Sequence, residues 1–97
     1  MISKYDEMRD IRRDTQFKRD VKRARKRGKD IEKLKTIIWT LSHSQKLPRE
    51  NKDHPLKGTL KDCRECHIEP DWLLIYRVNK DRVELELARS GSHAELF

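Results

Sequence analysis

Two apolar runs near the C-terminus, joined by a short polar turn, constrain the fold of this 97-residue chain most strongly. Trp72–Val78 is almost continuously apolar, which is typical of a strand covered on both faces. Arg82–Ala88 alternates apolar with charged or small residues, as a strand with one buried face does. The turn Asn79–Asp81 is too short for a parallel crossover, so the two strands must be antiparallel neighbours.

The first half of the chain has the periodicity of helices. A narrow apolar stripe predicts a basic helix over Phe17–Gly28, with the glycine suited to a left-handed helix end. Asp30 can cap a second helix, whose apolar residues recur with a period of about 3.6 residues as far as Ser42. The short link makes the pair an α-helical hairpin. A loop then extends to about Gly58.

Two further strands complete the predicted fold, one within Met8–Arg13 and one over Leu60–Ile68. We expect a single α+β domain over residues 1–97, with residues 1–7 frayed. Its two-helix hairpin should pack on one face of a small, mainly antiparallel sheet. The opposite face is then left for function.

The charge of the chain limits its partners. Lys and Arg number 24 against 17 Asp and Glu, and the net charge of +7 favours polyanions. There is no apolar run near the roughly 18 residues of a membrane span and no apolar leader, so we expect a cytoplasmic protein without membrane contact.

Much of this charge lies in the first helix. Seven cations there are balanced only by Asp20, and most such runs are simply solvated. Here their mutual repulsion favours contact with phosphates or an acidic partner. The seven are Lys18, Arg19, Lys22, Arg23, Arg25, Lys26 and Arg27.

Cys63, Cys66 and His67 form the C-x-x-C-H pattern of haem attachment. Haem attachment would require export and an apolar pocket, and the sequence indicates neither. A redox pair would open a helix after a strand, whereas this segment is strand-like. A zinc site on the cysteines would need two more ligands. We interpret both cysteines as incidental and expect no cofactor.

Five polar residues near strand ends or in loops form the candidate site: His54, His67, Asp71, Arg89 and His93. In an antiparallel hairpin, the start of one strand lies beside the end of the next, so Asp71 and His93 should be close together. Periodicity does not fix the position of His54.

Two chemistries fit this set of side chains. Three histidines and a carboxylate could bind zinc, but they lack the i, i+4 histidine pair of common zinc enzymes, so we favour a metal-free site. The other chemistry is RNA cleavage, in which the ribose 2′-OH attacks the adjacent phosphorus. Histidines suit both proton transfers, and arginine suits the phosphorane charge. Trp72, Tyr76 or Phe97 could stack on a base.

A family resemblance is carried by three blocks: Lys52–Gly58, His67–Tyr76 and Arg89–Phe97. In order, spacing and chemistry they resemble the YafQ-type mRNA interferase toxins of the RelE/ParE superfamily. The helical segment Lys18–Leu41 fits more loosely, and the resemblance covers about residues 8–97.

The resemblance implies a RelE-like β-α-α-β-β-β fold and the toxin of a type II toxin–antitoxin pair. It implies a ribosome-dependent endoribonuclease that cuts mRNA in the A site and inhibits translation. The implied partners are a DinJ-like antitoxin, the ribosome with its mRNA, and operator DNA bound only by the toxin–antitoxin complex. The site residues implied by position are the acid–base set His54, His67, Asp71 and His93, the phosphate-steadying Arg89, and Trp72 and Phe97, which would shape the site or stack within it.

Within this set we expect His93 to be the general acid, and Asp71, with His54 or His67, to act on the base side. Two alternatives stay open: a non-nucleolytic toxin of the superfamily, directed at gyrase as the ParE branch is, and a basic module that binds RNA or the ribosome. The number of histidines argues against the first, because inhibition of a protein needs no acid–base set.

Overall fold

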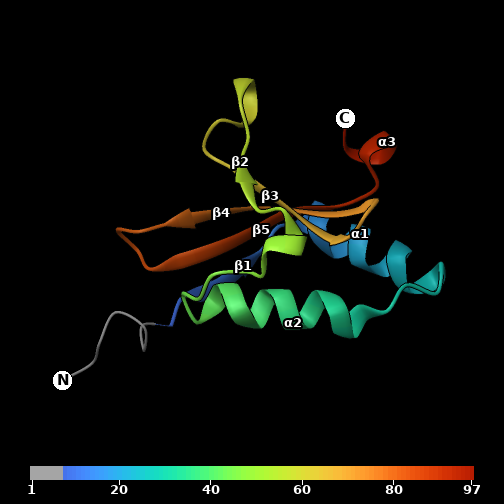
Figure 1. The fold of residues 1–97 in the computed structure, drawn as a ribbon, viewed down its shortest axis with the longest axis horizontal. Helices are drawn as coiled ribbons and strands as arrows, with labels where there is room; N and C mark the ends of the chain where they lie inside the picture. The colour runs from blue at the N-terminus through green and yellow to red at the C-terminus, as the bar shows by residue number, and fades with distance from the viewer. Residues whose placement is uncertain (1–7) are drawn as a thin grey trace.

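The computed structural model describes residues 8–97 and has an α+β fold (Figure 1). Its sheet has the strand order β1-β5-β4-β3-β2. The strands are β1 (Asp10–Arg13), β2 (His54–Pro55), β3 (Arg64–Glu69), β4 (Trp72–Asn79) and β5 (Glu84–Gly91). The helices are α1 (Thr15–Lys26), α2 (Ile31–Ser42) and α3 (His93–Leu96), with 3₁₀ turns η1 (Arg49–Asn51) and η2 (Gly58–Leu60). Residues 1–7, predicted to be frayed, lie outside the described part. Among the helices of residues 8–97, none is long and apolar enough to cross a bilayer.

The predicted helical hairpin is confirmed. α1 begins at Thr15, two residues before the predicted start, and Asp14 ahead of it is extended. Gly28 has a φ of +78°, the left-handed conformation expected at the end of this helix. Asp30 caps α2 by accepting a hydrogen bond from the backbone N–H of Glu32 at 3.1 Å.

The predicted β4–β5 hairpin is also confirmed, and β3 pairs antiparallel with β4. β1 runs parallel to β5, with Ile11 opposite Leu85, so the sheet is mixed and mainly antiparallel. The sequence analysis did not predict β2 or α3. Elements of two and four residues are too short to show a period.

Two strands begin later than predicted. The start of the predicted strand Leu60–Ile68 is the end of a 3₁₀ turn and a loop, and β3 begins only at Arg64. Val83, which lies within the predicted strand Arg82–Ala88, has a φ of +51°. Because this left-handed conformation cannot continue a strand, the hairpin turn extends to Val83 and β5 begins at Glu84.

The core lies between α1, α2 and one face of the sheet. Phe17, Leu34, Trp72, Leu74 and Leu85 are buried in it. α3 lies on the other side of the sheet from α2, and β2 forms the edge of the sheet (Figure 1). The predicted acid–base residues His54, His67 and His93 lie on that side, whereas Trp72 lies in the core and the predicted cations lie along α1.

The two cysteines do not behave as reactive thiols. Cys66 lies in the core, and burial raises the pKa of its thiol to about 12. Cys63 is half-buried, and desolvation raises the pKa of its thiol as well. Because the thiolate is the reactive form, both shifts fit the interpretation of these residues as incidental.

Candidate active site

The hairpin brings Asp71 and His93 together, as the sequence predicted. Leu73 in β4 lies opposite Gly91 in β5, so the residues just outside these strand ends meet. Nδ1 of His93 lies 2.9 Å from Oδ1 of Asp71, and the backbone N–H of His93 donates to the same oxygen at 3.0 Å. These hydrogen bonds lower the pKa of Asp71. The ionised carboxylate thus fixes Nδ1 of His93 as a proton donor and leaves Nε2 available for a substrate or ligand.

His67 lies beside this pair. Its ring centroid is 5.7 Å from that of His93, with the planes inclined by 57°. Its Nδ1 is 3.1 Å from the carbonyl oxygen of Pro70, which can only accept, so Nδ1 carries the proton and Nε2 is the basic nitrogen. Asn51 donates to the carbonyl oxygen of His67 at 2.7 Å and ties η1 to β3. Two imidazoles with fixed tautomers therefore share one surface.

His54 joins the site through an acidic residue that the sequence analysis missed. The pairing of β2 with β3 places His54 opposite Glu65, and Nε2 of His54 lies 3.0 Å from Oε2 of Glu65. Glu65 is buried, and among the described residues its Oε1 has no hydrogen-bond partner. A buried carboxylate oxygen without a partner is costly, which indicates use in function. Strand alternation could have revealed Glu65, because it lies two residues before His67 and faces the same side.

Three of these side chains have the arrangement of metal ligands. One ligand atom each of Glu65, His67 and His93 lies within 4.8 Å of the others. A carboxylate and two imidazoles suit zinc or copper, and the free Oε1 of Glu65 fits that use. A cation there would polarise a phosphate oxygen, while its ligands would no longer be free to carry protons. The metal-free site stays a prediction.

Arg89 lies in register with Ile75 and is held by α1. Its Nε and Nη2 donate to Asp20 at 2.8 and 3.4 Å. The fully buried Asp20 side chain also accepts from the backbone N–H of Ser90 at 3.0 Å. Nη1 of Arg89 makes no hydrogen bond within residues 8–97. The contact of Arg89 with phosphate stays a prediction, and Nη1 is the nitrogen that would make it.

Of the three aromatic candidates, only Phe97 is open to a nucleobase. It is 62% exposed, and its ring centroid lies 6.5 Å from that of His93. Tyr76 is 1% exposed and donates to Asp53 at 2.6 Å, so the suggestion that it stacks on a base is wrong. Trp72 is 2% exposed, which leaves it the predicted role of shaping the site rather than stacking.

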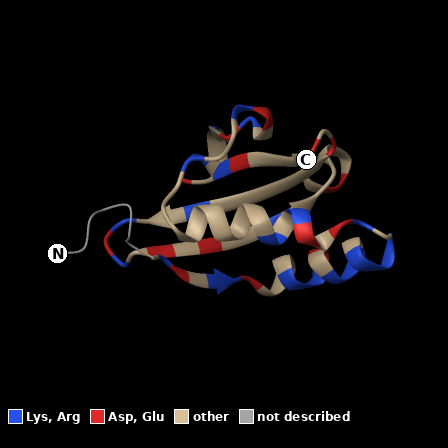
Figure 2. Ribbon diagram, turned by 60° about the horizontal axis from the view of Figure 1, so that its bottom comes forward, with Lys and Arg blue, Asp and Glu red and all other residues tan. Residues whose placement is uncertain are grey.

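The seven cations of α1 divide into two groups. Figure 2 shows Lys and Arg along most of this helix. Arg23 and Arg27 pair with Glu95 of α3. The other five are exposed and make no ion pair with any residue that the structure describes: Lys18, Arg19, Lys22, Arg25 and Lys26.

Comparison with known proteins identifies the family. A family model for the bacterial toxin of type II toxin–antitoxin system, YafQ, matches residues 9–97. The chain is 46% identical over 90 residues to the mRNA interferase toxin YafQ of Escherichia coli K12, covering 92% of this chain and 96% of that protein.

Solved structures give the same result. The E. coli DinJ–YafQ toxin–antitoxin complex matches with a TM-score of 0.85 and 45% identity, covering 93% of this chain and 98% of the matched chain. A metal-bound toxin from Helicobacter pylori matches with a TM-score of 0.88 and 46% identity, covering 93% of this chain and all of that one. The family resemblance in the sequence is thereby confirmed: the chain belongs to the YafQ family of toxins from bacterial type II toxin–antitoxin systems.

Proposed function

We propose that this protein is an mRNA interferase: a ribosome-dependent endoribonuclease that cuts mRNA in the ribosomal A site and so inhibits translation. The observation that carries the proposal is the Asp71–His93 pair beside His67 on an open side of the sheet. An E. coli relative with 46% identity is named an mRNA interferase toxin. A gyrase-directed toxin or a plain RNA-binding module would need no such group of proton carriers, which favours the nuclease over both.

We assign the chemistry to the acid–base groups of the chain, without a metal. A base takes the proton of the ribose 2′-OH, the 2′ oxygen bonds to the adjacent phosphorus, and the bond from phosphorus to the 5′ oxygen breaks. An acid then protonates the leaving oxygen. The products are a 2′,3′-cyclic phosphate and a 5′-hydroxyl.

His93 is the proposed acid: its Nδ1 donates to the carboxylate of Asp71, and a second proton, carried on Nε2, passes to the leaving oxygen. The sequence analysis expected Asp71 on the base side. Because Asp71 contacts His93, we now assign it to the support of the acid. The base is then His67, through its unprotonated Nε2, or the His54–Glu65 pair.

The remaining site residues would bind the substrate. Nη1 of Arg89 would steady the charge that develops on phosphorus. Phe97 would stack on a base of the mRNA, while the buried Trp72 supports the site from within the fold.

A DinJ-like antitoxin is the proposed protein partner, and operator DNA would be bound only by the toxin–antitoxin complex. The five unpaired cations of α1 would attract phosphates of ribosomal RNA or an acidic antitoxin segment. The cytoplasm, where ribosomes are found, is the proposed location.

The decisive experiment is induction of the protein in bacteria, followed by mapping of mRNA 5′ ends. We expect new ends within translated regions, and purified protein should cut the same mRNA only when ribosomes are present. His93→Ala should abolish these ends. His43→Ala is the matched control, because His43 stacks on Trp39 of α2 with centroids 3.9 Å apart, outside the site. Undiminished ends in the His93 variant would refute the proposal.

The metal-free mechanism has its own test. Elemental analysis of the purified protein should find no stoichiometric zinc or copper, and cleavage should not depend on either. A bound metal whose removal stops cleavage would replace the acid–base assignment with a metal site on Glu65, His67 and His93.

A further inference from the structure

His93, the proposed general acid, belongs to α3, a helix too short to be stable without contacts to the rest of the domain. α3 has four residues and no buried one, and an isolated helix of one turn is unstable in water. A capping box forms part of its structure: Ser92 accepts from the backbone N–H of Glu95 at 3.2 Å, and Oε1 of Glu95 accepts from the backbone N–H of Ser92 at 2.9 Å. These bonds shape the turn but do not attach it to the rest of the domain.

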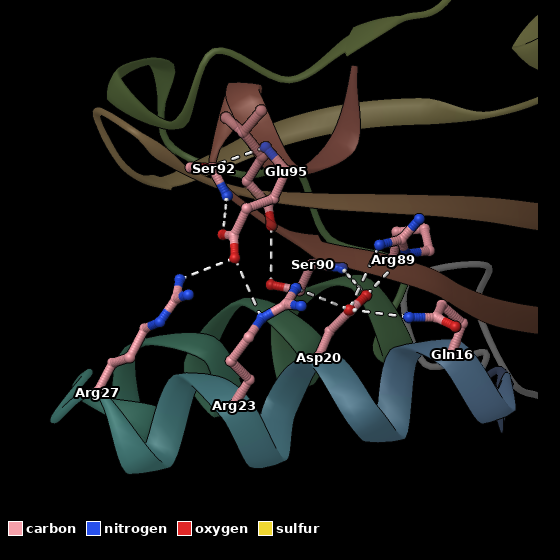
Figure 3. Close-up of polar contacts among 9 residues, drawn as sticks. Gln16, Asp20, Arg23, Arg27, Arg89, Ser90, Ser92 and Glu95 are labelled. Atoms are coloured by element: carbon pink, nitrogen blue, oxygen red, sulfur yellow. Dashed lines mark hydrogen bonds and ion pairs between the residues drawn. The ribbon is translucent and has the colours of Figure 1, made fainter.

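The other carboxylate oxygen of Glu95 attaches α3 to the helical hairpin, in addition to the contact of His93 with Asp71. Oε2 lies 2.7 Å from Nη1 of Arg27 and 3.1 Å from Nε of Arg23, so one oxygen joins α3 to Arg23 in α1 and to Arg27 at the C-cap of this helix (Figure 3). Side chains of opposite charge from α3 and the C-terminal part of α1 meet here, and Glu95 is only two residues from His93.

The arginine side of this contact is itself ordered by a buried charge. Nη2 of Arg23 donates to Oδ1 of Asp20 at 3.1 Å, and Asp20 also holds Arg89 and the backbone of Ser90 in β5 (Figure 3). An isolated surface ion pair contributes little, but a network anchored on a buried carboxylate costs less entropy to form.

α3 also lies very close to the strand before it. A Cβ added at Gly91 would lie 3.1 Å from Oε1 of Glu95 and 3.3 Å from Cδ2 of Leu96. Glycine therefore permits the chain to fold back, and Glu95 is held between β5 and α1.

We propose that Glu95, held by Arg23 and Arg27, is a positioning residue that fixes His93 for proton transfer. The inference rests on the proposed nuclease function. It separates Arg23 and Arg27 from the five outward cations of α1: the pair acts on the catalytic step, whereas the five act on binding.

Kinetics on ribosome-bound mRNA can separate these roles. Glu95→Gln keeps an oxygen that can accept from Ser92 but loses the charge that pairs with the arginines. Because small displacements of catalytic groups are costly, we expect kcat to fall about tenfold while KM changes less than about twofold. Arg27→Gln should lower kcat similarly, and the double variant should have the kcat of the single ones.

Arg25→Gln is the matched control, because Arg25 lies in the same last turn of α1, is exposed and has no ion pair within residues 8–97. It should raise KM without lowering kcat, and its effect should multiply with that of Glu95→Gln. A wild-type kcat in Glu95→Gln, or independent multiplying effects of Glu95→Gln and Arg27→Gln on kcat, would overturn the proposal.

Amide relaxation measured by NMR on the free protein tests the same inference without RNA. Glu95→Gln should increase the mobility of the His93 and Ala94 amides and leave those of β5 unchanged, whereas Arg25→Gln should change neither. If the wild-type protein cleaves no mRNA, the proposed function fails while this test still stands. If α3 is as ordered in Glu95→Gln as in wild type, the positioning role fails whatever the protein cleaves.

Discussion

The two sides of the sheet are held together by different interactions. On the helical side, Leu34, Leu74 and Leu85 are almost completely buried and pack against one another. On the other side, His67 and His93 are partly exposed and are placed by hydrogen bonds to a carbonyl and a carboxylate. Burial of apolar surface drives folding, whereas hydrogen bonds fix geometry with a smaller net gain in stability. Substitutions on the helical side should therefore change stability, and those on the other side should change catalysis.

The largest effect on stability is expected from Leu85→Ala. Leu85 is fully buried in β5 as part of the core, and the lost contacts and the cavity should lower the free energy of unfolding by about 2–5 kcal/mol. Urea unfolding measures this loss. Leu96→Ala in the half-buried part of α3 is the control and should cost about 1 kcal/mol or less. Equal losses in the two variants would contradict the contrast between the sides.

On the opposite side, Asp71→Asn should impair the reaction and spare the fold. The amide cannot hold His93 as the carboxylate does, so we expect cleavage to slow about 10²-fold in single-turnover assays. The urea midpoint should stay unchanged, because the Asp71 side chain is 68% exposed. Asp62→Asn removes another exposed carboxylate, outside the acid–base set, and should have wild-type activity. A slow Asp62 variant, or an Asp71 variant of normal speed, would remove the basis for assigning the acid.

The elements that bury apolar residues were predictable from the sequence, whereas several of the polar contacts were not. The helices and the hairpin were predictable because burial imposes a period on the apolar residues. The contact of Asp71 with His93 followed from the hairpin alone. Glu65 was missed because a glutamate among polar neighbours gives no sign of burial until strand alternation is applied to it. Arg23 and Arg25 are equivalent in a basic run, and only the fold places Glu95 beside the first of them.

Tyr76 connects the core to the loop that carries His54. Its substitution should therefore have an effect of intermediate size on both stability and cleavage. Its ring belongs to the core, and its hydroxyl donates at 2.6 Å to Asp53, the residue before His54. Burial raises the pKa of this hydroxyl above its ordinary value, so it stays a donor at neutral pH. Tyr76→Phe should lower the free energy of unfolding by about 1–2 kcal/mol in urea titrations. It should also slow cleavage several-fold, because the loop that carries His54 loses this contact.

A control for this variant comes from the other donors to Asp53. Arg64 donates to both carboxylate oxygens at 3.3 Å. Arg64→Gln should therefore slow cleavage in the same direction, with a smaller loss of stability, because this side chain is only partly buried. If Tyr76→Phe loses stability but keeps full activity, the loop is positioned independently of the core.

The smallest effect is expected where Glu69, at the end of β3, meets the helical hairpin. Glu69 accepts from Lys33 at 3.0 Å and from Lys29 at 3.2 Å, and these bonds lower its pKa below the ordinary 4.5. The folded state thus binds this proton less tightly than the unfolded chain. The pairing therefore stabilises the fold above pH 4.5 and is lost as the pH falls through the lower, folded pKa. Glu69→Gln should cost less than about 1 kcal/mol at neutral pH in thermal unfolding, and the difference from wild type should vanish once the pH falls below the lowered pKa of Glu69. Glu32→Gln, which removes a 78% exposed partner of Lys35 within α2, should cost still less at any pH. A deficit in Glu69→Gln that persists at low pH would show that packing, rather than charge, joins β3 to the helices.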